Sequence, residues 1–394
     1  MNDENEFKMK EKNIVYFDNA ATTFKPKRVI NKIVDYYNNY CANSHRGDYD
    51  ISFKVDDEID YTRNRVKQFI NANKKEEIIF TKNTTDSINT IVFGFFLNYL
   101  KDGDEIILSS SEHASNILPW MILSTKKNVK IVFIDSINNK LDINDLFNKI
   151  NDKTKVISLA QITNVTGDKR DIKSICKKAH EKGVLVVCDA AQSAPHMKID
   201  VKDLDVDFLA FSAHKMCGPT GIGVLYGKYE LLLKMFPFTY GGGMNLNYNE
   251  NNLELAPIPY RFESGTPNIA GIIGFSEAIN FILEYGLDNI ERKEKHLRKY
   301  LVSELEKIPY IKIYNKDCEG SIVTINIEGI LSGDLGLYLN TKGICVRSGK
   351  HCAKMGDNKE DTVRISLYFY NTYEEIDYLI NALKDKKSIE EFAK

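Results

Sequence analysis

Lys215 is the residue of this chain whose surroundings most suit covalent chemistry. It follows the apolar run 208–211 and Ser212, and it precedes a turn that contains Gly218 and Gly221. A lysine among apolar and small neighbours loses its proton more readily than a solvated lysine, and a neutral amine attacks an aldehyde. Taken alone, Lys215 would more often be a tucked-in or solvent-facing lysine, so the interpretation depends on a partner.

Asp189 is a candidate for that partner. It lies 26 positions upstream (215 minus 189), at the end of the apolar run 184–188. Taken alone, Asp189 would more often cap a helix that begins at Ala190. A Schiff-base amine and an anion that keeps a pyridine nitrogen protonated are, however, the two groups that pyridoxal phosphate requires. The two residues together therefore favour a pyridoxal phosphate site.

Thr84 and Thr85 follow the strand-like run 77–81 and open a helical segment. Free backbone N–H groups at the start of a helix, next to two hydroxyls, form a cradle for a phosphate. Ordinary capping by Asn83 or Thr84 is the alternative, but the order of strand, hydroxyl-rich turn and helix favours phosphate. The segment 261–268, RFESGTPN, precedes another helical segment and is a second candidate phosphate contact.

His113 follows the strand-like run 105–109. An imidazole in a loop of this kind can stack on a flat ring or shuttle a proton, since its ordinary pKa is about 6.5. A loop histidine that is satisfied by local hydrogen bonds is the common alternative. The sequence leaves these roles open.

Cys352 lies on the hydrophilic loop 347–360, beside His351. Positively charged neighbours favour the thiolate, which is the nucleophilic form of cysteine. Three such neighbours are close in the sequence: Arg347, Lys350 and Lys354. Cys345, between Ile344 and Val346, is instead typical of a small core residue. The sequence therefore predicts a reactive role for Cys352.

Strand-like and helical segments alternate between residues 77 and 226. This alternation predicts an α/β fold with a large, mostly parallel sheet and functional loops at the carboxyl ends of its strands. Five candidate site residues fall directly after strand-like runs: Thr84, His113, Asn164, Asp189 and Lys215. Residues 241–267 show neither the helical nor the strand-like pattern of apolar residues, and they are expected to be irregular. A long amphipathic helix over 290–308 precedes a smaller α+β unit.

Composition excludes several classes of protein. The 394 residues include 53 basic and 55 acidic side chains, for a net charge of −2, which indicates neither a nucleic-acid nor a membrane partner. The longest apolar run, 91–97, is far shorter than the ~20 residues of a membrane span. The charged N-terminal stretch predicts no secretion signal, and so a cytoplasmic protein. Seven cysteines without a CxxC pair indicate neither a disulfide framework nor a metal site.

Nine segments together resemble the cysteine desulfurases of the class V aminotransferase group, over nearly the whole chain. In order they are YFDNAAT, NTTDSIN, SEHASNILPW, NVTG, DAAQ, SAHKMCGPTGIG, RFESGTPN, RSGKHCA and RISLYFYNTYEEID. The form RSGKHCA resembles the second subgroup, the SufS and CsdA kind. The resemblance implies a fold type I pyridoxal phosphate transferase, with a large sheet domain and a small C-terminal α+β domain.

The resemblance also implies roles for individual residues. Lys215 would bind pyridoxal 5′-phosphate covalently, Asp189 would pair with the ring nitrogen, and His113 would lie over the ring. Gln192 would contact the phenolic oxygen. The phosphate would be held by Thr85, its neighbour Thr84, Ser212 and His214, and by Thr266 from a second subunit. The substrate carboxylate would meet Arg364 and Asn164, in a pocket also lined by His45 and Arg347.

The activity implied is the conversion of L-cysteine to L-alanine with a persulfide on Cys352, for transfer to an acceptor protein in iron–sulfur cluster assembly. The expected organisation is a segment 1–25 joining the small domain, a cofactor domain 26–289 and a small domain 290–394 that carries Cys352. A selenocysteine lyase or another class V lyase or transaminase is the alternative enzyme, and a non-catalytic scaffold is the alternative of another class. Only ten residues, 354–363, separate Ala353 from Arg364, fewer than is usual in this subgroup.

Overall fold

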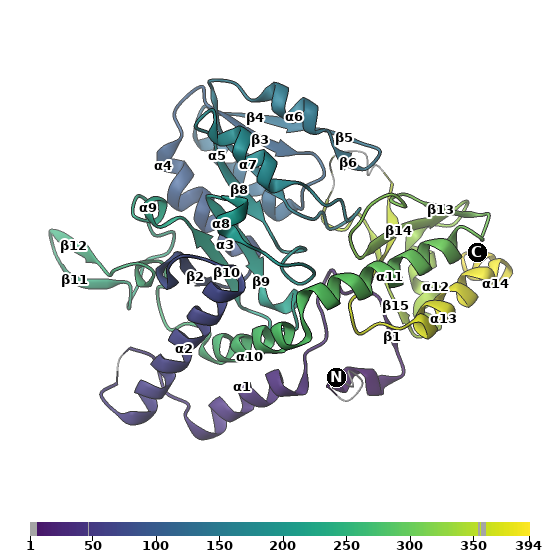
Figure 1. Ribbon diagram of the computed structural model, residues 1–394, viewed down its shortest axis with the longest axis horizontal. Coiled ribbons are helices and arrows are strands. Elements are labelled where there is room, and N and C mark those ends of the chain that lie inside the picture. Colours follow the sequence, from purple (N-terminus) through teal and green to yellow (C-terminus); the bar gives the residue numbers. More distant parts are fainter. Residues whose placement is uncertain (1–5, 46, 354, 356–359) are drawn as a thin grey trace.

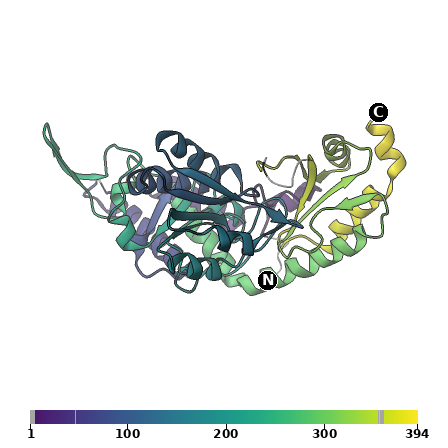
Figure 2. The same ribbon diagram turned by 90° about the horizontal axis from the view of Figure 1, so that it is seen from above.

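The computed structural model describes residues 6–45, 47–353, 355 and 360–394. A large sheet and a smaller one are connected by the long helix α11 (Leu287–Leu305) (Figures 1 and 2). The α/β architecture predicted from the alternating segments is confirmed.

The large sheet has seven strands in the order β2-β10-β9-β8-β7-β3-β4. All neighbouring pairs are parallel except those of β10, which runs antiparallel to β2 and β9. The bounds are β2 (Ile78–Thr81), β3 (Glu105–Ser109), β4 (Lys130–Ile134), β7 (Thr154–Ala160), β8 (Leu185–Asp189), β9 (Phe208–Ser212) and β10 (Gly223–Gly227). The central strands read as continuous apolar runs because helices cover both of their faces.

Each face of the large sheet packs on its own helices. One core contains residues of α1 (Lys27–Asn39), α2 (Asp50–Phe69), α7 (Ile172–His180) and α10 (Ile269–Tyr285). The other contains residues of α3 (Thr84–Ile91), the π-helix Val92–Phe96 and α5 (Leu118–Lys126). Four short helices complete this part of the chain: α4 (Leu97–Tyr99), α6 (Ile143–Lys149), α8 (Val201–Leu204) and α9 (Tyr229–Leu232).

The smaller sheet is antiparallel, in the order β13-β14-β17-β16. Its strands are β13 (Ile311–Ile313), β14 (Ile322–Ile327), β16 (Arg347–Gly349) and β17 (Thr362–Ser366). It shares a core with α11, α12 (Ser332–Thr341), α13 (Tyr373–Lys384) and α14 (Lys386–Phe392). The N-terminal segment joins this unit, because β1 (Val15–Tyr16) pairs in parallel with β15 (Ile344–Cys345).

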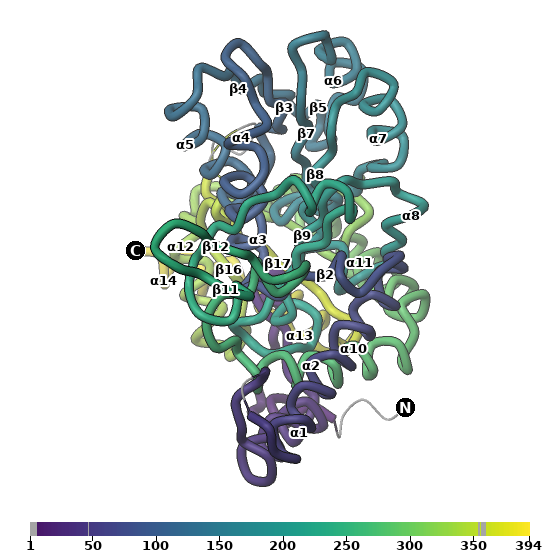
Figure 3. The backbone as a smooth tube through the Cα atoms, turned by 90° about the vertical axis from the view of Figure 1, so that its left-hand side faces the viewer, coloured from purple at the N-terminus to yellow at the C-terminus, as the bar shows by residue number. Residues whose placement is uncertain are grey.

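Two hairpins lie outside these sheets. One is small and joins β5 (Ser136–Ile137) to β6 (Lys140–Leu141). The other, β11 (Asn245–Asn249) and β12 (Asn252–Leu255), projects away from the body of the molecule at the left of Figures 1 and 2. Figure 3 is seen from that side, so the hairpin lies in front of the rest of the chain. The expectation that 241–267 is irregular was therefore wrong in part. The asparagines and glycines of this segment are typical of turns, and a strand with few packed neighbours shows little apolar alternation.

Within the described residues, no single helix is long and apolar enough to cross a membrane. The pair α10 and α11 satisfies length and composition only when joined across a bend of 71°. Most of α10 is buried against the rest of the protein.

Candidate active site

A cavity of about 260 Å³ lies at the carboxyl ends of the central strands, and we call it the cofactor cavity. It brings together most of the residues singled out in the sequence: Thr84, Thr85, His113, Asn164, Asp189, Gln192, Ser212, His214, Lys215, Arg347 and Arg364. The parallel sheet explains this convergence, because consecutive β-α loops emerge at one edge.

Lys215 and Asp189 occupy the buried part of this cavity. Burial lowers the pKa of Lys215 to about 8, although the Asp189 charge opposes the shift. Burial likewise raises the pKa of Asp189 to about 6, against the backbone N–H of Ala191, which donates to Oδ1 at 2.9 Å. Lys215 thus loses its proton far more readily than an ordinary lysine, although the charged form still predominates below pH 8, and Asp189 is an anion held at a fixed position.

The turn that carries Lys215 is fixed by close backbone contacts. Gly218 donates its N–H to Ala213 O at 2.9 Å, and a Cβ at Gly218 would lie 2.8 Å from that oxygen. On the other side, His214 O accepts from Thr23 N at 3.1 Å and from Lys25 Nζ at 2.9 Å. The N-terminal segment therefore helps to hold the peptide next to Lys215.

The start of α3 forms the hydroxyl-rich wall of the cavity. Thr84 N donates to Ser212 Oγ at 2.8 Å, and the two hydroxyls are 2.6 Å apart. Asn83 caps the helix by accepting from Asp86 N at 2.9 Å. Gly223 lets β10 pass directly beneath this turn, because a Cβ there would lie 2.5 Å from Asn83 Cα. The helix cap is made by the Asn83 side chain, whereas the hydroxyls of Thr84, Thr85 and Ser212 would form the phosphate cradle. The two roles are therefore compatible.

His113 is held as a neutral imidazole. Burial, together with the nearby Lys215 charge, lowers its pKa to about 4. Its Nδ1 accepts from Ser115 N at 3.1 Å, so the ring proton is assigned to Nε2. Ser115 Oγ lies 2.9 Å from the same Nδ1 and 2.7 Å from Thr85 Oγ1. Ser115 thus connects the histidine to the hydroxyl-rich wall.

Arg364 and Asn164 form the wall contributed jointly by the two units. Arg364 donates through Nη1 to Asn164 O at 3.0 Å and through Nη2 to Asp18 Oδ1 at 2.9 Å. Asn164 Nδ2 donates to His351 O at 2.7 Å. The small unit is in this way connected to the cofactor cavity directly beside Cys352.

Cys352 lies on an exposed loop at the edge of the cavity. Its Sγ is 3.2 Å from Arg347 Nη2, and its carbonyl oxygen accepts from Ala114 N at 2.8 Å. His351 and Cys352 both have left-handed backbone conformations, with φ of 52° and 60°. Non-glycine residues adopt this conformation at a cost of about 1–2 kcal/mol each. Lys354 and residues 356–359, which make up half of the shortened segment 354–363, lie outside the described residues.

Two predicted site residues lie elsewhere. His45 and Thr266 line a different cavity, of about 380 Å³, and neither lines the cofactor cavity of its own chain. Asp56 holds His45 there, because its Oδ1 accepts from the His45 backbone N at 2.8 Å and lies 3.3 Å from Nδ1. Within its own chain His45 therefore does not line the cofactor cavity, and its expected place at the substrate pocket stays a prediction. Thr266 was expected to act from a second subunit.

Sequence reasoning missed two residues that complete the site. Ser115 lines the cavity and bonds to both Thr85 and His113, and Asp18 pairs with Arg364. A signal for Ser115 was its position two residues after His113, where a serine commonly bonds to a local ring or backbone. No signal for the Asp18–Arg364 pair was available, because 346 positions separate the two residues.

The cavity wall fits pyridoxal 5′-phosphate. In the described part of the chain, three buried atoms of this wall have no hydrogen-bond partner: Asn164 Oδ1, Gln192 Oε1 and Arg364 Nε. Buried polar atoms are rarely left unpaired unless a bound group completes them. Around them stand an amine of lowered pKa, an anchored carboxylate and hydroxyls at a helix start, which are the groups that a pyridine aldehyde phosphate requires.

Comparison with known proteins agrees with this chemistry. The chain matches the family Aminotransferase class-V over residues 15–379. It is 42% identical over 386 residues to a probable cysteine desulfurase of Staphylococcus aureus (strain Mu50), covering 96% of this chain and 94% of that protein. It is 43% identical over 379 residues to a probable cysteine desulfurase of Ureaplasma parvum serovar 3, covering 95% and 94%.

Solved structures agree as well. An apo cysteine desulfurase from Thermococcus onnurineus NA1 has a TM-score of 0.93 at 36% identity, covering 97% of this chain and 96% of that one. The S-sulfonic acid form of the cysteine desulfurase CsdA from Escherichia coli has a TM-score of 0.91 at 32% identity, covering 99% and 98%. The chain therefore belongs to the aminotransferase class V family, among its pyridoxal phosphate-dependent cysteine desulfurases.

Proposed function

We propose that Cys352 takes the sulfur atom of L-cysteine bound in the cofactor cavity. The C–S bond of the substrate breaks, an S–S bond forms at Cys352 Sγ, and the carbon skeleton leaves as L-alanine after it has gained a proton. The observation that carries this proposal is the position of the Cys352 thiol at the edge of the cavity, 3.2 Å from Arg347, which itself lines the wall.

Residues of different charge are placed to bind different groups of the substrate and the cofactor. Arg364, with Nε still unpartnered, and Asn164 are placed to bind the substrate carboxylate. When bound, pyridoxal phosphate supplies an electron sink that stabilises negative charge at the substrate's α-carbon. Asp189 would hold the ring nitrogen in its protonated form, and the hydroxyls of Thr84, Thr85 and Ser212 would bind the phosphate.

Two groups can move protons. Lys215, with a pKa lowered to about 8 by burial, is suited to remove the α-proton once its amine is free. His113 is neutral and carries its proton on Nε2, from which it can donate to the departing sulfur or the ring oxygen. Arg347 is placed to stabilise the Cys352 thiolate before it attacks.

The persulfide would pass to a sulfur-acceptor protein, and we propose iron–sulfur cluster assembly in the cytoplasm as its use. We further propose a homodimer, in which Thr266 and His45 of one subunit reach the cofactor cavity of the other. Support for the dimer comes from the separate cavity that holds both residues and from the exposed apolar side chains of the nearby β11–β12 hairpin.

The test is to incubate the protein with L-cysteine, measure alanine, and search the Cys352 peptide for one added sulfur atom by mass spectrometry. We expect Cys352→Ser to lose more than about 100-fold in alanine formation, since the nucleophile is gone, while it retains the visible absorbance of bound cofactor. Cys41→Ser, at another exposed cysteine, is the matched control and should keep full activity.

A Cys352→Ser protein that still released sulfur from L-cysteine at the normal rate would contradict the proposal. Activity retained on selenocysteine alone would support a selenocysteine lyase instead. A protein that cannot be loaded with pyridoxal phosphate would support the alternative of a non-catalytic scaffold.

A further inference from the structure

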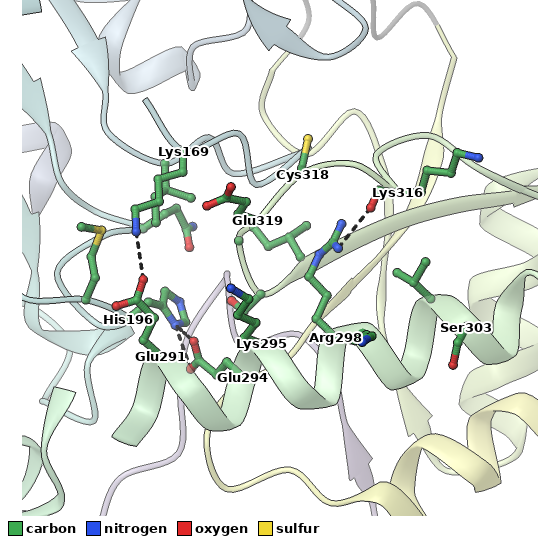
Figure 4. Close-up of a pocket in the computed structure, with 18 of the residues that line it drawn as sticks. Lys169, His196, Glu291, Glu294, Lys295, Arg298, Ser303, Lys316, Cys318 and Glu319 are labelled. Carbon is green, nitrogen blue, oxygen red and sulfur yellow. Dashed lines mark hydrogen bonds and ion pairs between the residues drawn. The ribbon is translucent and has the colours of Figure 1, made fainter. Parts of the chain in front are cut away.

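A second cavity, of about 410 Å³, lies between α11 and the segment that leads into β14 (Figure 4). It is formed where α11 leaves the large sheet and enters the small unit, so both units contribute walls. Helix α11 sends side chains into it at helical spacing: Glu291, Glu294, Lys295, Arg298 and Val302. Cavities of this size accommodate small organic ligands.

Arg298 carries a buried positive charge that has no carboxylate partner among the described residues. Arg298 as a whole is only 7% exposed, and its Nε is buried without a hydrogen-bond partner in the described part of the chain. The other guanidinium nitrogens donate only to carbonyl oxygens, Nη2 to Asn315 O at 2.6 Å and Nη1 to Lys316 O at 3.3 Å. Burial lowers the pKa of Arg298. A buried guanidinium without a carboxylate partner is costly, and a bound anion would relieve this.

Several other charges around the second cavity already have partners. Lys169 pairs with Glu291 at 2.9 Å. His196 Nδ1 lies 2.9 Å from Glu294. Lys316 lies 4.0 Å from Glu306. Carboxylates therefore offset the positive charges of Lys169 and Lys316.

The remaining charges of the lining favour an anion. Among the described residues, Lys295, Arg298 and Lys299 form no ion pair, and Glu319 is the one lining carboxylate without a cationic partner. Apolar side chains supply other parts of the wall: Ile162, Met197, Val302 and Ile322. The lining is thus complementary to an anion that carries an apolar body, and one guanidinium nitrogen with two rim ammonium groups suits a carboxylate.

The second cavity also adjoins the cofactor cavity. Gln192 and Ile162 line both. Gln192 donates through Nε2 to Ala20 O at 2.9 Å, and its Oε1 is buried without a partner. A ligand in the second cavity would therefore contact a side chain that also faces the cofactor.

We propose that the second cavity is a regulatory site for a small organic carboxylate with an apolar body. Arg298 and Lys295 bind the carboxylate, and Gln192 transmits the effect of binding to the cofactor. The site is distinct from the substrate position at Arg364, because Arg298 does not line the cofactor cavity.

Benzoate is a suitable probe, titrated into the holoenzyme by isothermal calorimetry while the visible absorbance of the cofactor is recorded. We expect saturable binding of one benzoate per chain and a shift of the absorption band. Benzamide, which has the same shape without the charge, should bind at least about tenfold more weakly. The variant Arg298→Gln keeps a donor for the carbonyl oxygens but lacks the charge, and it should also bind benzoate at least about tenfold more weakly.

Val302→Trp fills the cavity from a half-buried position and should abolish binding even if Arg298→Gln does not fold. Lys307→Ala, on the turn after α11 where Lys307 pairs with Glu304, is the matched control and should bind normally. Absence of binding, or binding that survives both Arg298→Gln and Val302→Trp, would overturn the site. Binding without any change in absorbance would overturn the link through Gln192.

Discussion

Ser115 shows how one side chain can coordinate two parts of a site. Its hydroxyl lies 2.7 Å from Thr85 Oγ1, on the wall proposed for the phosphate, and 2.9 Å from Nδ1 of His113. The backbone N–H of Ser115 also donates to that nitrogen at 3.1 Å. The hydroxyl therefore fixes the ring's orientation, while the tautomer is set mainly by the backbone.

We expect Ser115→Ala to reduce kcat by about tenfold, within the usual effect of a misplaced acid–base group, with only a small change in cofactor affinity. Because the backbone donor remains, the pH dependence of kcat should keep its shape. Steady-state kinetics across pH, with cofactor content measured by absorbance, check this. Ser115→Thr keeps the hydroxyl and should restore most of the activity, and a failure of that rescue would contradict a positioning role.

At the scale of elements, the turn before α3 depends on how closely β10 passes beneath it. A Cβ at Gly223 would lie 2.5 Å from Asn83 Cα and 2.6 Å from Asn83 C. These are backbone atoms, which cannot rotate away as a side chain can. A side chain at position 223 would therefore push the start of α3 and strand β10 apart.

We expect Gly223→Ala to lower the free energy of unfolding by about 2–3 kcal/mol, through overpacking, and to weaken cofactor binding because the hydroxyl-rich wall shifts. Urea unfolding and cofactor titration measure the two effects. Gly333→Ala, in the first turn of α12 with nothing within 4 Å of the added Cβ, is the control. It should be neutral or stabilising by up to about 1 kcal/mol. Equal stability of both variants would contradict the contact.

Helix α7 is attached to the large sheet by a cluster of charges at its C-terminal end. His180 Nε2 lies 2.8 Å from Asp207 Oδ2, and Nδ1 lies 3.0 Å from Asp205 Oδ2. Asp207 also accepts from Val186 N of β8 at 2.7 Å. The hydrogen bond to Asp207 is the main cause of the raised pKa of His180.

A raised pKa in the folded state means that the stabilising contribution of His180 is complete below its unfolded pKa of about 6.5 and is lost as pH rises through the folded value. We expect His180→Asn to lose about 1 kcal/mol of stability at acidic pH, and progressively less at alkaline pH. Urea unfolding of wild type and variant across this range tests it. A loss of stability that is the same at every pH would contradict this account.

At the scale of the whole molecule, the β11–β12 hairpin exposes apolar side chains that a single chain leaves in solvent. Leu246 and Tyr248 of β11 are 62% and 73% exposed, and Leu253, the cross-strand neighbour of Tyr248, is 51% exposed. Apolar side chains that cluster on a projecting element usually mark a protein interface. This supports the proposed homodimer.

We expect wild-type protein to be a dimer by light scattering and the double variant Leu246→Asp, Tyr248→Asp to be a monomer, because charges would be buried at the interface. The monomer should also bind pyridoxal phosphate more weakly if Thr266 acts across subunits. Asn247→Asp, between the two apolar positions, is the control and should stay dimeric. A monomeric wild type, or a double variant that remains a dimer with full cofactor affinity, would contradict the arrangement.

The sequence by itself determined which groups do the chemistry and roughly where they lie. Lys215, Asp189 and Thr84 could be recognised because each follows an apolar strand, and parallel strands bring their carboxyl ends to one edge. The exposed position of Cys352 was likewise visible in its hydrophilic neighbours. These inferences rest on local patterns, which a linear sequence contains in full.

Only the tertiary structure decided which side chains meet across long separations. It placed Ser115 between Thr85 and His113, paired Asp18 with Arg364, and moved His45 to a different cavity. It also created the second cavity, where α11 passes between two units. Such contacts depend on how whole elements pack in three dimensions, and the local pattern around each residue does not specify that packing.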